Sequence, residues 1–409
     1  MKIKHVAFAK IGKSLKFASA YSPIGGDNEG PAMLRLLANN NPDMSFYLVG
    51  RSDFNKLTDK QRAELFPYGN VVNCYTKGAA TPTSVISFFE HHNIRPDVFI
   101  AMPGQIGTVT IPGKIQQINN PSLIASVIDM TKNYTTPIVS WMNEVKVPIV
   151  EIINDPRYTL KQSRDIIPHP HVSLSQYDFT YVKNSILSYV DQTRVEHTVT
   201  AKYAEMEKIF LYDRISPVNN RERKTNFMVV LNEGSPSRYN MLKQWVLDEI
   251  KDVEVYGKWE HTETLNDSRF CGSMNIDELQ DKLKDVRSTF IIPIADGWVT
   301  SKYIEMIHAG VVPFLHPSYD GQNHLGLPEF LRPKNSKELL ERIEMMKNDE
   351  SYTKVIDALQ KKYCKPEYYN GTKLCEIIFG STNSNYVLPD LSKFKKQTYE
   401  DFSLENFFG

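Results

Sequence analysis

Apolar residues recur along the chain in two alternating patterns. Short, nearly continuous apolar runs, such as DVFIAM at residues 97–102 and VPIVEII at residues 147–153, are typical of parallel strands covered on both faces. Between such runs, apolar residues spaced three and four apart predict amphipathic helices, and the segment before residue 147 places Trp141, Met142 and Val145 on one helical face. This alternation predicts an α/β fold built on parallel sheets.

The alternation runs through the chain twice. In the first half it predicts a helix at residues 30–38 and strands at residues 5–9, 45–50, 97–102, 147–153, 178–182 and 208–212. In the second half it predicts strands at residues 226–231, 253–256 and 289–294 and helices at residues 238–250, near 276–286 and after 335.

A stretch rich in Pro, Asn and charge, residues 216–224 (SPVNNRERK), separates the two halves and is a good domain linker. We therefore expect Rossmann-like domains at residues 1–217 and 218–380, the first binding an acceptor and the second a donor. Residues 381–409 are expected to form an extension that packs back on the first domain. Two parallel-sheet domains facing across a cleft suit a reaction between a nucleotide-bound donor and a separate acceptor.

Composition narrows the class of protein. The chain has 409 residues, too many for one typical core. Its 48 basic and 48 acidic residues give zero formal charge, so overall charge does not announce a nucleic-acid partner, although a local basic groove is compatible with it. Four cysteines without metal-type spacing, and apolar runs too short for a membrane span or signal peptide, predict a cytoplasmic protein.

Several common catalytic motifs are absent from the sequence. It contains no GxxxxGK[ST] loop, no GxGxxG after the first strand, no HExxH and no GxSxG. These absences argue against a P-loop protein, a classical dinucleotide-binding protein, a zinc protease and a hydrolase. The histidines of PHPH, His169 and His171, have no third clustered ligand and favour a polar loop over a metal site.

The second half offers candidate contacts to a nucleotide. Ser235 and Arg238 follow a strand at a helix start, where free N–H groups and an arginine make a phosphate site, although an ordinary capped helix explains them equally well. Tyr256 and Gly257 end the next strand, and Met274 closes a turn before the next helix. Such turns let the backbone contact a nucleobase edge, but they are also common connections.

Residues 300–315 (TSKYIEMIHAGVVPFL) predict a short helix followed by a buried strand. Thr300 or Ser301 can cap this helix and Gly310 can end it. Lys302 and Glu305 lie three apart on one face, so a cation for phosphate and a carboxylate for a ribose diol can point to one site. The alternative is a helix of any α/β domain with a solvated glutamate.

The first half offers candidates for acid–base chemistry. Asp155 follows a strand, where it could act as general base or simply cap a turn before proline. Glu29 begins a helix after the first strand, where it could orient a substrate or only favour the helix dipole. Arg157, Lys161 and Arg164 could contact nucleic-acid phosphates or be solvated loop charges.

Five segments together resemble one family. VPIVEIINDPR, LNEGSPSRYN, VEVYGKW, FCGSM and TSKYIEMIHAGVV occur in family order within roughly residues 1–380. In this respect the chain resembles the bacteriophage DNA base glycosyltransferases of the T-even β-glucosyltransferase type. The resemblance implies a GT-B fold, a UDP-sugar donor and, as acceptor, 5-hydroxymethylcytosine in double-stranded DNA.

The resemblance also implies roles for individual residues. Asp155 matches the catalytic base and Glu29 a second essential acid near the sugar. The donor would be held by Ser235 and Arg238 at the diphosphate, Met274 at the uracil and Glu305 at the ribose. The family has two arginines in its diphosphate loop and an arginine on the following helix, where this chain has only Arg238 and Lys302, and lysine lacks the bidentate fork of arginine.

The implied reaction is inverting transfer by direct displacement, with the target base extruded from the duplex. UDP-glucose is the family's usual donor and UDP-arabinose a competitor. A divalent cation, Mg²⁺ or Mn²⁺, could assist release of UDP, although the sequence has no carboxylate pair dedicated to one. The resemblance implies a monomer working in the cytoplasm of an infected host cell. A glycosyltransferase for a non-DNA acceptor, such as lipopolysaccharide or a small metabolite, and a non-catalytic nucleotide- or DNA-binding protein remain alternatives.

Overall fold

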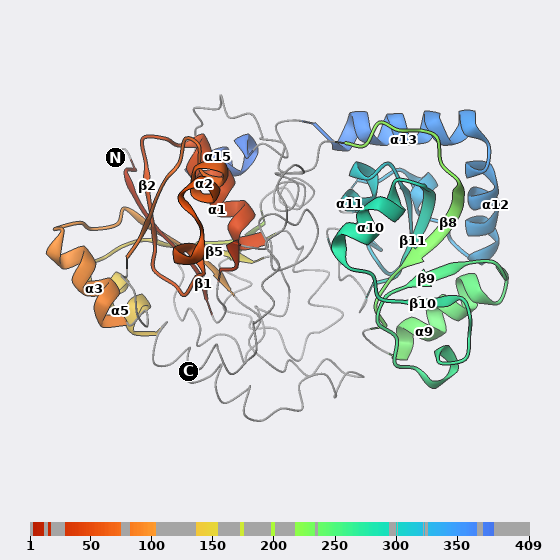
Figure 1. Ribbon diagram of the computed structural model, residues 1–409, viewed down its shortest axis with the longest axis horizontal. Helices are drawn as coiled ribbons and strands as arrows, with labels where there is room; N and C mark the ends of the chain where they lie inside the picture. Colours follow the sequence, from red (N-terminus) through yellow and green to blue (C-terminus); the bar gives the residue numbers. More distant parts are fainter. Residues whose placement is uncertain are drawn as a thin grey trace.

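The computed structural model describes the chain in segments that form two α/β units (Figure 1). The described residues are 3–11, 15–17, 29–74, 82–103, 136–153, 172–175, 198–200, 217–233, 236–293, 300, 302–321, 323, 326–365 and 371–379. The strands are β1 (His5–Ile11), β2 (Ser45–Leu48), β3 (Asn70–Asn73), β4 (Val98–Pro103), β5 (Ile149–Ile153), β6 (Val172–Ser175), β7 (Thr198–Thr200), β8 (Thr225–Val230), β9 (Glu254–Tyr256), β10 (Phe270–Gly272), β11 (Val286–Ile291) and β12 (Val312–Leu315). The α-helices are α1 (Glu29–Asn40), α2 (Asp59–Leu65), α3 (Pro82–His91), α5 (Thr136–Glu144), α9 (Pro236–Leu242), α10 (Ile276–Leu283), α11 (Lys302–His308), α12 (Ser336–Met346), α13 (Asp349–Tyr363) and α15 (Thr372–Phe379).

The N-terminal unit is a parallel sheet covered on both faces. Among the described residues its strand order is β3-β2-β1-β4-β5-β6-β7. Alternate residues of β1 enter different apolar clusters: Val6 and Phe8 pack with residues of α1, whereas Ala7 and Ala9 pack with residues of α3 and α5. This period of two follows from the pleat of a strand and makes the unit doubly wound.

The C-terminal unit is a second parallel sheet, with the order β10-β9-β8-β11-β12 in the described part of the chain. Its first strand, β8, is followed by β9 and β10 on one side, while β11 and β12 lie on the other. The connections leaving β8 and β11 therefore diverge between these two strands. Such a switch in strand order is the position where open α/β sheets bind ligands, outside the carboxyl ends of the strands.

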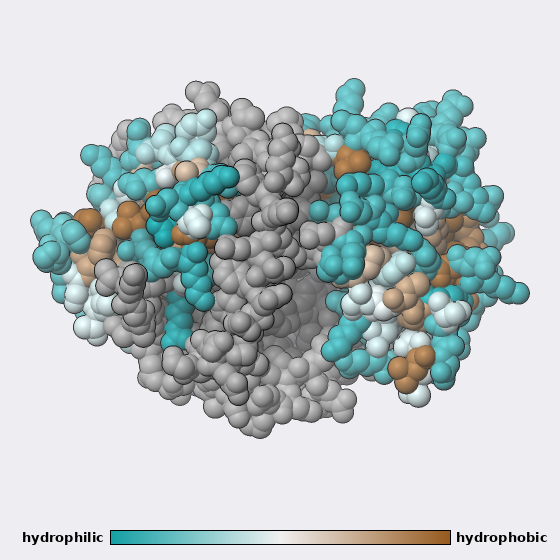
Figure 2. All heavy atoms as spheres, in the orientation of Figure 1, coloured by the Kyte–Doolittle hydropathy of each residue, from teal (hydrophilic) through white to brown (hydrophobic). Residues whose placement is uncertain are grey.

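Two amphipathic helices cover the outer side of the second unit. Asn335 caps α12 and Asn348 caps α13, each side chain accepting a backbone N–H bond. Helix α13 buries Tyr352, Ile356 and Leu359 at intervals of three and four, as a helix with one apolar face does. Its opposite face carries the charged residues, and the surface along α13 is mostly hydrophilic (Figure 2).

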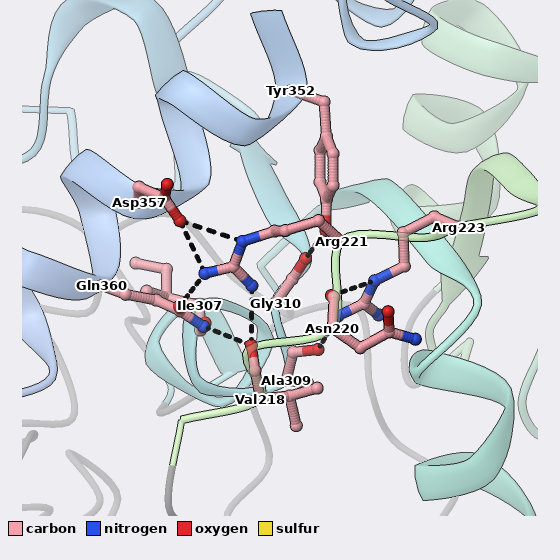
Figure 3. Close-up of polar contacts among 10 residues, drawn as sticks. All are labelled: Val218, Asn220, Arg221, Arg223, Ile307, Ala309, Gly310, Tyr352, Asp357 and Gln360. Carbon is pink, nitrogen blue, oxygen red and sulfur yellow. Dashed lines mark hydrogen bonds and ion pairs between the residues drawn. The ribbon is translucent and has the colours of Figure 1, made fainter. Parts of the chain in front are cut away.

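The chain enters the second unit through a segment held by two arginines (Figure 3). Arg221 donates to Asp357 Oδ1 (2.7 Å) and Gln360 Oε1 (2.6 Å) on α13. Arg223, 5% exposed, donates to Leu283 O (2.6 Å) at the end of α10 and to Ala309 O (3.0 Å) just after α11. A cation at helix C-termini satisfies free carbonyls and complements the helix dipoles. Arg223 thus fastens two helices to the strand that follows it.

The last described helix, α15, returns to the first unit and lies beside α1 (Figure 1). Asn41 donates to Cys375 Sγ (3.2 Å), and the ring of Phe379 meets that of Phe46 edge-on with centroids 6.5 Å apart. At Gly371, φ is +86° and an added Cβ would lie 2.8 Å from Leu36 Cβ, so a side chain would be strained and crowded there. The predicted division at residue 217 and the extension from residue 381 stay predictions.

The two-domain α/β fold predicted from the apolar pattern is confirmed, and so are most of its elements. The predicted strands at residues 178–182 and 208–212 lie outside the described residues. The predicted helix at residues 238–250 is helical but changes to a π-helical turn at Lys243–Leu247. The described strands β3, β6 and β7 and helices α2 and α3 were missed, and the short β10 was taken for a turn.

Strand β11 begins earlier than predicted. Residues 276–286 were expected to be helical, but α10 ends at Leu283 and β11 starts at Val286. The polar residues Arg287 and Ser288 concealed the start of the strand, because both side chains are buried within it. Both are satisfied: Arg287 donates to Lys347 O (2.6 Å) and Ser288 to Asn226 O (2.8 Å).

Candidate functional site

Charged side chains gather where the strand order of the C-terminal sheet switches, between β8 and β11. Arg238 comes from α9, which follows β8, and Lys302 and Glu305 come from α11, which follows β11. Both helices start at the carboxyl edge of the sheet because the strands are parallel. The roles predicted for these three residues in binding a donor stay predictions.

Arg238 spans the switch between the two strands. Its Nη1 donates to Asn232 O (2.7 Å) after β8, and its Nη2 donates to Ile292 O (2.8 Å) after β11. The side chain is 9% exposed, and burial lowers its pKa to about 10, an effect that Tyr319 partly offsets. Its Nε has no hydrogen-bond partner among the described residues. Arg238 therefore links the loop after β8 to the loop after β11 through Nη1 and Nη2. It also places a buried positive charge at the carboxyl edge of the sheet.

Lys302 adds a second cation. Its Nζ donates to Val230 O (2.6 Å), the last residue of β8. Burial lowers the pKa of Lys302 to about 8, the carboxylate of Glu305 opposes this shift, and the positive charge of Arg238 reinforces it. Glu305 is 8% exposed and lies one helical turn further along α11.

The electrostatics of these three groups favour an anion. Two desolvated cations close enough to depress a lysine pKa repel one another, and a single carboxylate balances only one of them. Backbone carbonyls offset part of the remaining charge through the hydrogen bonds of Arg238 and Lys302. A phosphate group placed against this edge would relieve the repulsion and gain charge-assisted hydrogen bonds.

Two glycines shape the neighbouring loops after β9 and β10. At Gly257 φ is +143°, and an added Cβ would lie 2.1 Å from Leu231 O, so only glycine fits the close approach of these loops. Its N–H donates to Gly272 O (2.8 Å). Gly272 has φ +80° and open space around it, and it is exposed together with Ser273. Met274, half-buried, directly precedes Asn275, which caps α10.

Tyr256 has partners of its own. Its hydroxyl donates to Glu254 Oε1 (3.4 Å), and Lys282 Nζ lies 5.6 Å from the centre of its ring. Burial, followed by the charge of Glu254, raises the pKa of Tyr256. These contacts explain Tyr256 as a structural residue of the sheet, and its predicted contact with the donor stays a prediction.

Most acceptor-side candidates cannot be placed. Asp155, Arg157, Lys161 and Arg164 lie outside the described residues, and so does the donor-side candidate Ser235. Glu29 begins α1 after β1, as predicted, but its side chain is also outside the described part. Their assigned roles stay predictions.

Two buried polar residues at the carboxyl edges of the sheets were not predicted from the sequence. Lys10, 6% exposed, lies near the end of β1, where it pairs in register with Met102 of β4 across the strand switch of the N-terminal sheet. A lysine in an otherwise apolar strand, HVAFAKI, was the signal that could have found it. Tyr319, fully buried, follows β12 and had no signal in the local sequence.

The described residues give no indication of a metal centre or a membrane segment. Within them, no three His, Cys, Asp or Glu side chains cluster as metal ligands. No helix in the described ranges has both the length and the apolar character required to cross a membrane.

Comparison with solved structures identifies the fold. The chain is similar to the DNA-modifying enzyme β-glucosyltransferase, solved in the presence and absence of uridine diphosphoglucose, with a TM-score of 0.53 and 11% identity over 91% of this chain and 98% of that chain. It is similar to the T4 phage enzyme in complex with its UDP-glucose substrate, with a TM-score of 0.52 and 10% identity over 91% and 98%. A further structure of T4 phage β-glucosyltransferase gives 0.51 and 11% over the same shares.

No protein-family profile and no curated protein matches the sequence. At identities near one in ten, the structural similarity shows the shared architecture, a two-domain α/β fold of the GT-B type.

Proposed function

We propose that the protein transfers a sugar from a UDP-sugar to the hydroxymethyl group of 5-hydroxymethylcytosine in double-stranded DNA. The observation that carries the proposal is the set of Arg238, Lys302 and Glu305 at the strand switch of the C-terminal sheet. A nucleoside diphosphate supplies both groups that this set calls for, an anion for the two cations and a diol for the carboxylate.

In the donor half, Lys302 and Arg238 balance the charge of the diphosphate, and Glu305 accepts hydrogen bonds from the ribose hydroxyls. Ser235 and the start of α9 add backbone N–H donors to a phosphate. The exposed turn through Gly272 and Met274 contacts the uracil, next to Gly257. The ammonium group of lysine lacks the bidentate geometry of a guanidinium group, so Lys302 acts as a point charge on the diphosphate.

In the acceptor half, Asp155 accepts the proton of the hydroxymethyl group. The freed oxygen attacks the anomeric carbon, the bond from that carbon to the UDP oxygen breaks, and UDP leaves with its electron pair, so the anomeric configuration inverts. The positive charges at the donor site stabilise the departing diphosphate. Glu29 orients the sugar, and Arg157, Lys161 and Arg164 contact DNA phosphates around a base extruded from the duplex.

The donor is UDP-glucose or UDP-arabinose. If the reaction uses a divalent cation, the role of the cation is to assist release of UDP. The similar T4 phage enzyme was solved with UDP-glucose, which supports a uridine donor but not a particular sugar for this chain. We expect the protein to act as a monomer in the cytoplasm.

The test is to incubate the protein with hydroxymethylated or unmodified duplex DNA and to offer UDP-glucose and UDP-arabinose separately. The DNA is then digested, and mass spectrometry measures the masses of the released nucleosides. We expect a mass gain of one hexose or one pentose on hydroxymethylcytosine only, abolished by Asp155→Asn. No gain with either donor would contradict the DNA acceptor. UDP binding without a gain would then favour another acceptor, and no UDP binding would contradict a sugar-transfer role altogether.

A further inference from the structure

The buried hydroxyl of Tyr319 bonds both main-chain groups of Thr300, just before α11. The side chain is fully buried, and its hydroxyl accepts a hydrogen bond from Thr300 N (3.0 Å) and donates one to Thr300 O. The same oxygen lies 3.3 Å from Thr300 Oγ1. A phenol in a core normally satisfies one partner, so bonding both main-chain groups of one residue is a specific arrangement.

The residue held in this way leads directly into α11. Thr300 stands two positions before Lys302, the first residue of the helix, and five before Glu305. The helix has only seven residues, too few to be stable by its own hydrogen bonds. Tertiary contacts must therefore fix the direction and rotation of α11. The two bonds from Tyr319 to the main chain of Thr300 fix them at the N-terminal end of the helix, where Lys302 and Glu305 lie.

The loop that carries Tyr319 is itself fixed, so it can serve as an anchor. His316 N donates to Ile291 O (2.9 Å), which extends the pairing of β11 with β12, and Tyr319 N donates to His316 O (2.8 Å). The His316 ring packs edge-on against Trp245, with centroids 4.8 Å apart. Arg332 Nη2 donates to Asp320 O (2.9 Å), the residue that follows Tyr319.

The anchor also connects with the rest of the site. Arg238 already joins the loop after β8 to the loop after β11. Tyr319 joins the loop after β12 to the same region through Thr300, and its hydroxyl acts electrostatically on Arg238. Three loops at the carboxyl edge are thereby tied into one unit, by one arginine and one tyrosine.

We infer that Tyr319 is a positioning residue of the donor site, which holds the start of α11 so that Lys302 and Glu305 meet the diphosphate and the ribose in one fixed geometry. This role rests on the proposed function, because it assumes that a nucleoside diphosphate binds there. Tyr319 itself touches no donor atom. It acts through Thr300, and its contribution to binding is preorganisation of the site before the donor arrives.

The chain offers a matched control in Tyr352. This tyrosine is also fully buried in the C-terminal unit, and its hydroxyl donates to Gly310 O (2.6 Å) beyond the opposite end of α11. Tyr352→Phe and Tyr319→Phe each delete one hydroxyl from an equally buried ring. Any general loss of stability is common to both, whereas only Tyr319→Phe releases the end of the helix that carries Lys302.

The experiment measures UDP binding by titration calorimetry and amide hydrogen exchange along α11 in the wild type and both variants. We expect Tyr319→Phe to weaken UDP binding about tenfold or more and to speed exchange in the first turn of α11, while Tyr352→Phe leaves UDP affinity within about twofold of the wild type.

Each negative outcome of this experiment has a different interpretation. Equal UDP affinity in the two tyrosine variants, or unchanged exchange at the start of α11 in Tyr319→Phe, would overturn the positioning role. A wild-type protein that does not bind UDP would instead contradict the proposed function, and the exchange data would still decide whether Tyr319 holds the helix.

Discussion

At the scale of single residues, the donor-side candidates show what sequence spacing can and cannot predict. Lys302 and Glu305 were found because a separation of three on a short helix places them on one face. The hydrogen bond from Lys302 to Val230 O, and those from Arg238 to two loop carbonyls, could not be foreseen. They depend on β8 and β11 being neighbours, which is a property of strand order and not of local sequence.

The lowered pKa of Lys302 predicts pH-dependent binding. Lysine is charged below its pKa, so UDP affinity should be highest below pH 8 and fall as the pH rises through about 8, by at most about tenfold per pH unit. Lys302→Arg should bind UDP with little change between pH 7 and 9, because arginine stays charged. Calorimetric titration at several pH values measures this, and an identical pH profile in the wild type and the arginine variant would contradict it.

The lowered pKa of Lys302 also predicts how the stability of the protein depends on pH, and this dependence runs opposite to that of UDP affinity. The pKa of Lys302 is about 8 in the folded protein against an ordinary value of 10.5, so the unfolded chain binds more protons between these limits. The contribution of Lys302 to stability therefore rises with pH from about 8 to 10.5. Urea unfolding of the wild type and Lys302→Met across this window should show the difference in free energy of unfolding changing in that direction. A constant difference would argue against burial as the cause of the shift.

Two glycines at neighbouring loops provide a matched pair. Gly257→Ala should destabilise the protein by about 3 kcal/mol or more, since it adds a clash with Leu231 O to an unfavourable φ. Gly272→Ala meets no atom within 4 Å and should cost only about 1 kcal/mol of backbone strain. Chemical denaturation measures both. Equal losses would show that the close approach of the loops is not what requires glycine at position 257.

At the scale of elements, apolar periodicity identified the strands that are apolar throughout and missed those that are not. Strand β1 and strand β4 were predicted because nearly every position is apolar. Strand β11 was predicted three residues late because buried Arg287 and Ser288 find their partners in distant loops and a neighbouring strand. Strand β10 has only three residues, half-buried or exposed, and leaves no periodic signal.

The buried Arg223 carries an element-scale prediction. Arg223→Met would leave carbonyls at the ends of α10 and α11 without their charged donor, and should lower the free energy of unfolding by about 3 kcal/mol. Arg221→Met removes bonds to the exposed Asp357, to Gln360 and to Val218 O, leaves no helix end without its donor, and should cost less, about 1 to 2 kcal/mol. Urea unfolding of both variants is the measurement. A larger loss for Arg221→Met would contradict the account of how this segment is anchored.

At the scale of the whole molecule, the chain passes from the N-terminal unit to the C-terminal unit and returns. The repeat of the strand–helix rhythm predicted two domains, but α15, placed by sequence within the second domain range, contacts α1 of the first unit. Nothing in its own eight residues specifies a partner, since any apolar helix face could accept its apolar side chains.

A truncation after residue 365 tests the structural part of this arrangement. It removes α15 and exposes the apolar residues of α1 and β2 against which Gly371 and Phe379 lie. We expect a lower melting temperature for the N-terminal unit and retained UDP binding by the C-terminal unit. Two transitions in calorimetry would report the units separately, and loss of UDP binding in a truncated protein with an intact second transition would contradict the assignment of the donor site to the C-terminal unit alone.

The proposed donor site is the carboxyl edge between β8 and β11, where a uridine diphosphate is expected to bind. A crystal structure of the protein with UDP is the decisive measurement. We expect phosphate oxygens within hydrogen-bond distance of Lys302 Nζ and the start of α9, with the ribose hydroxyls on Glu305. UDP bound elsewhere on the molecule, or no UDP bound at saturating concentration, would contradict it.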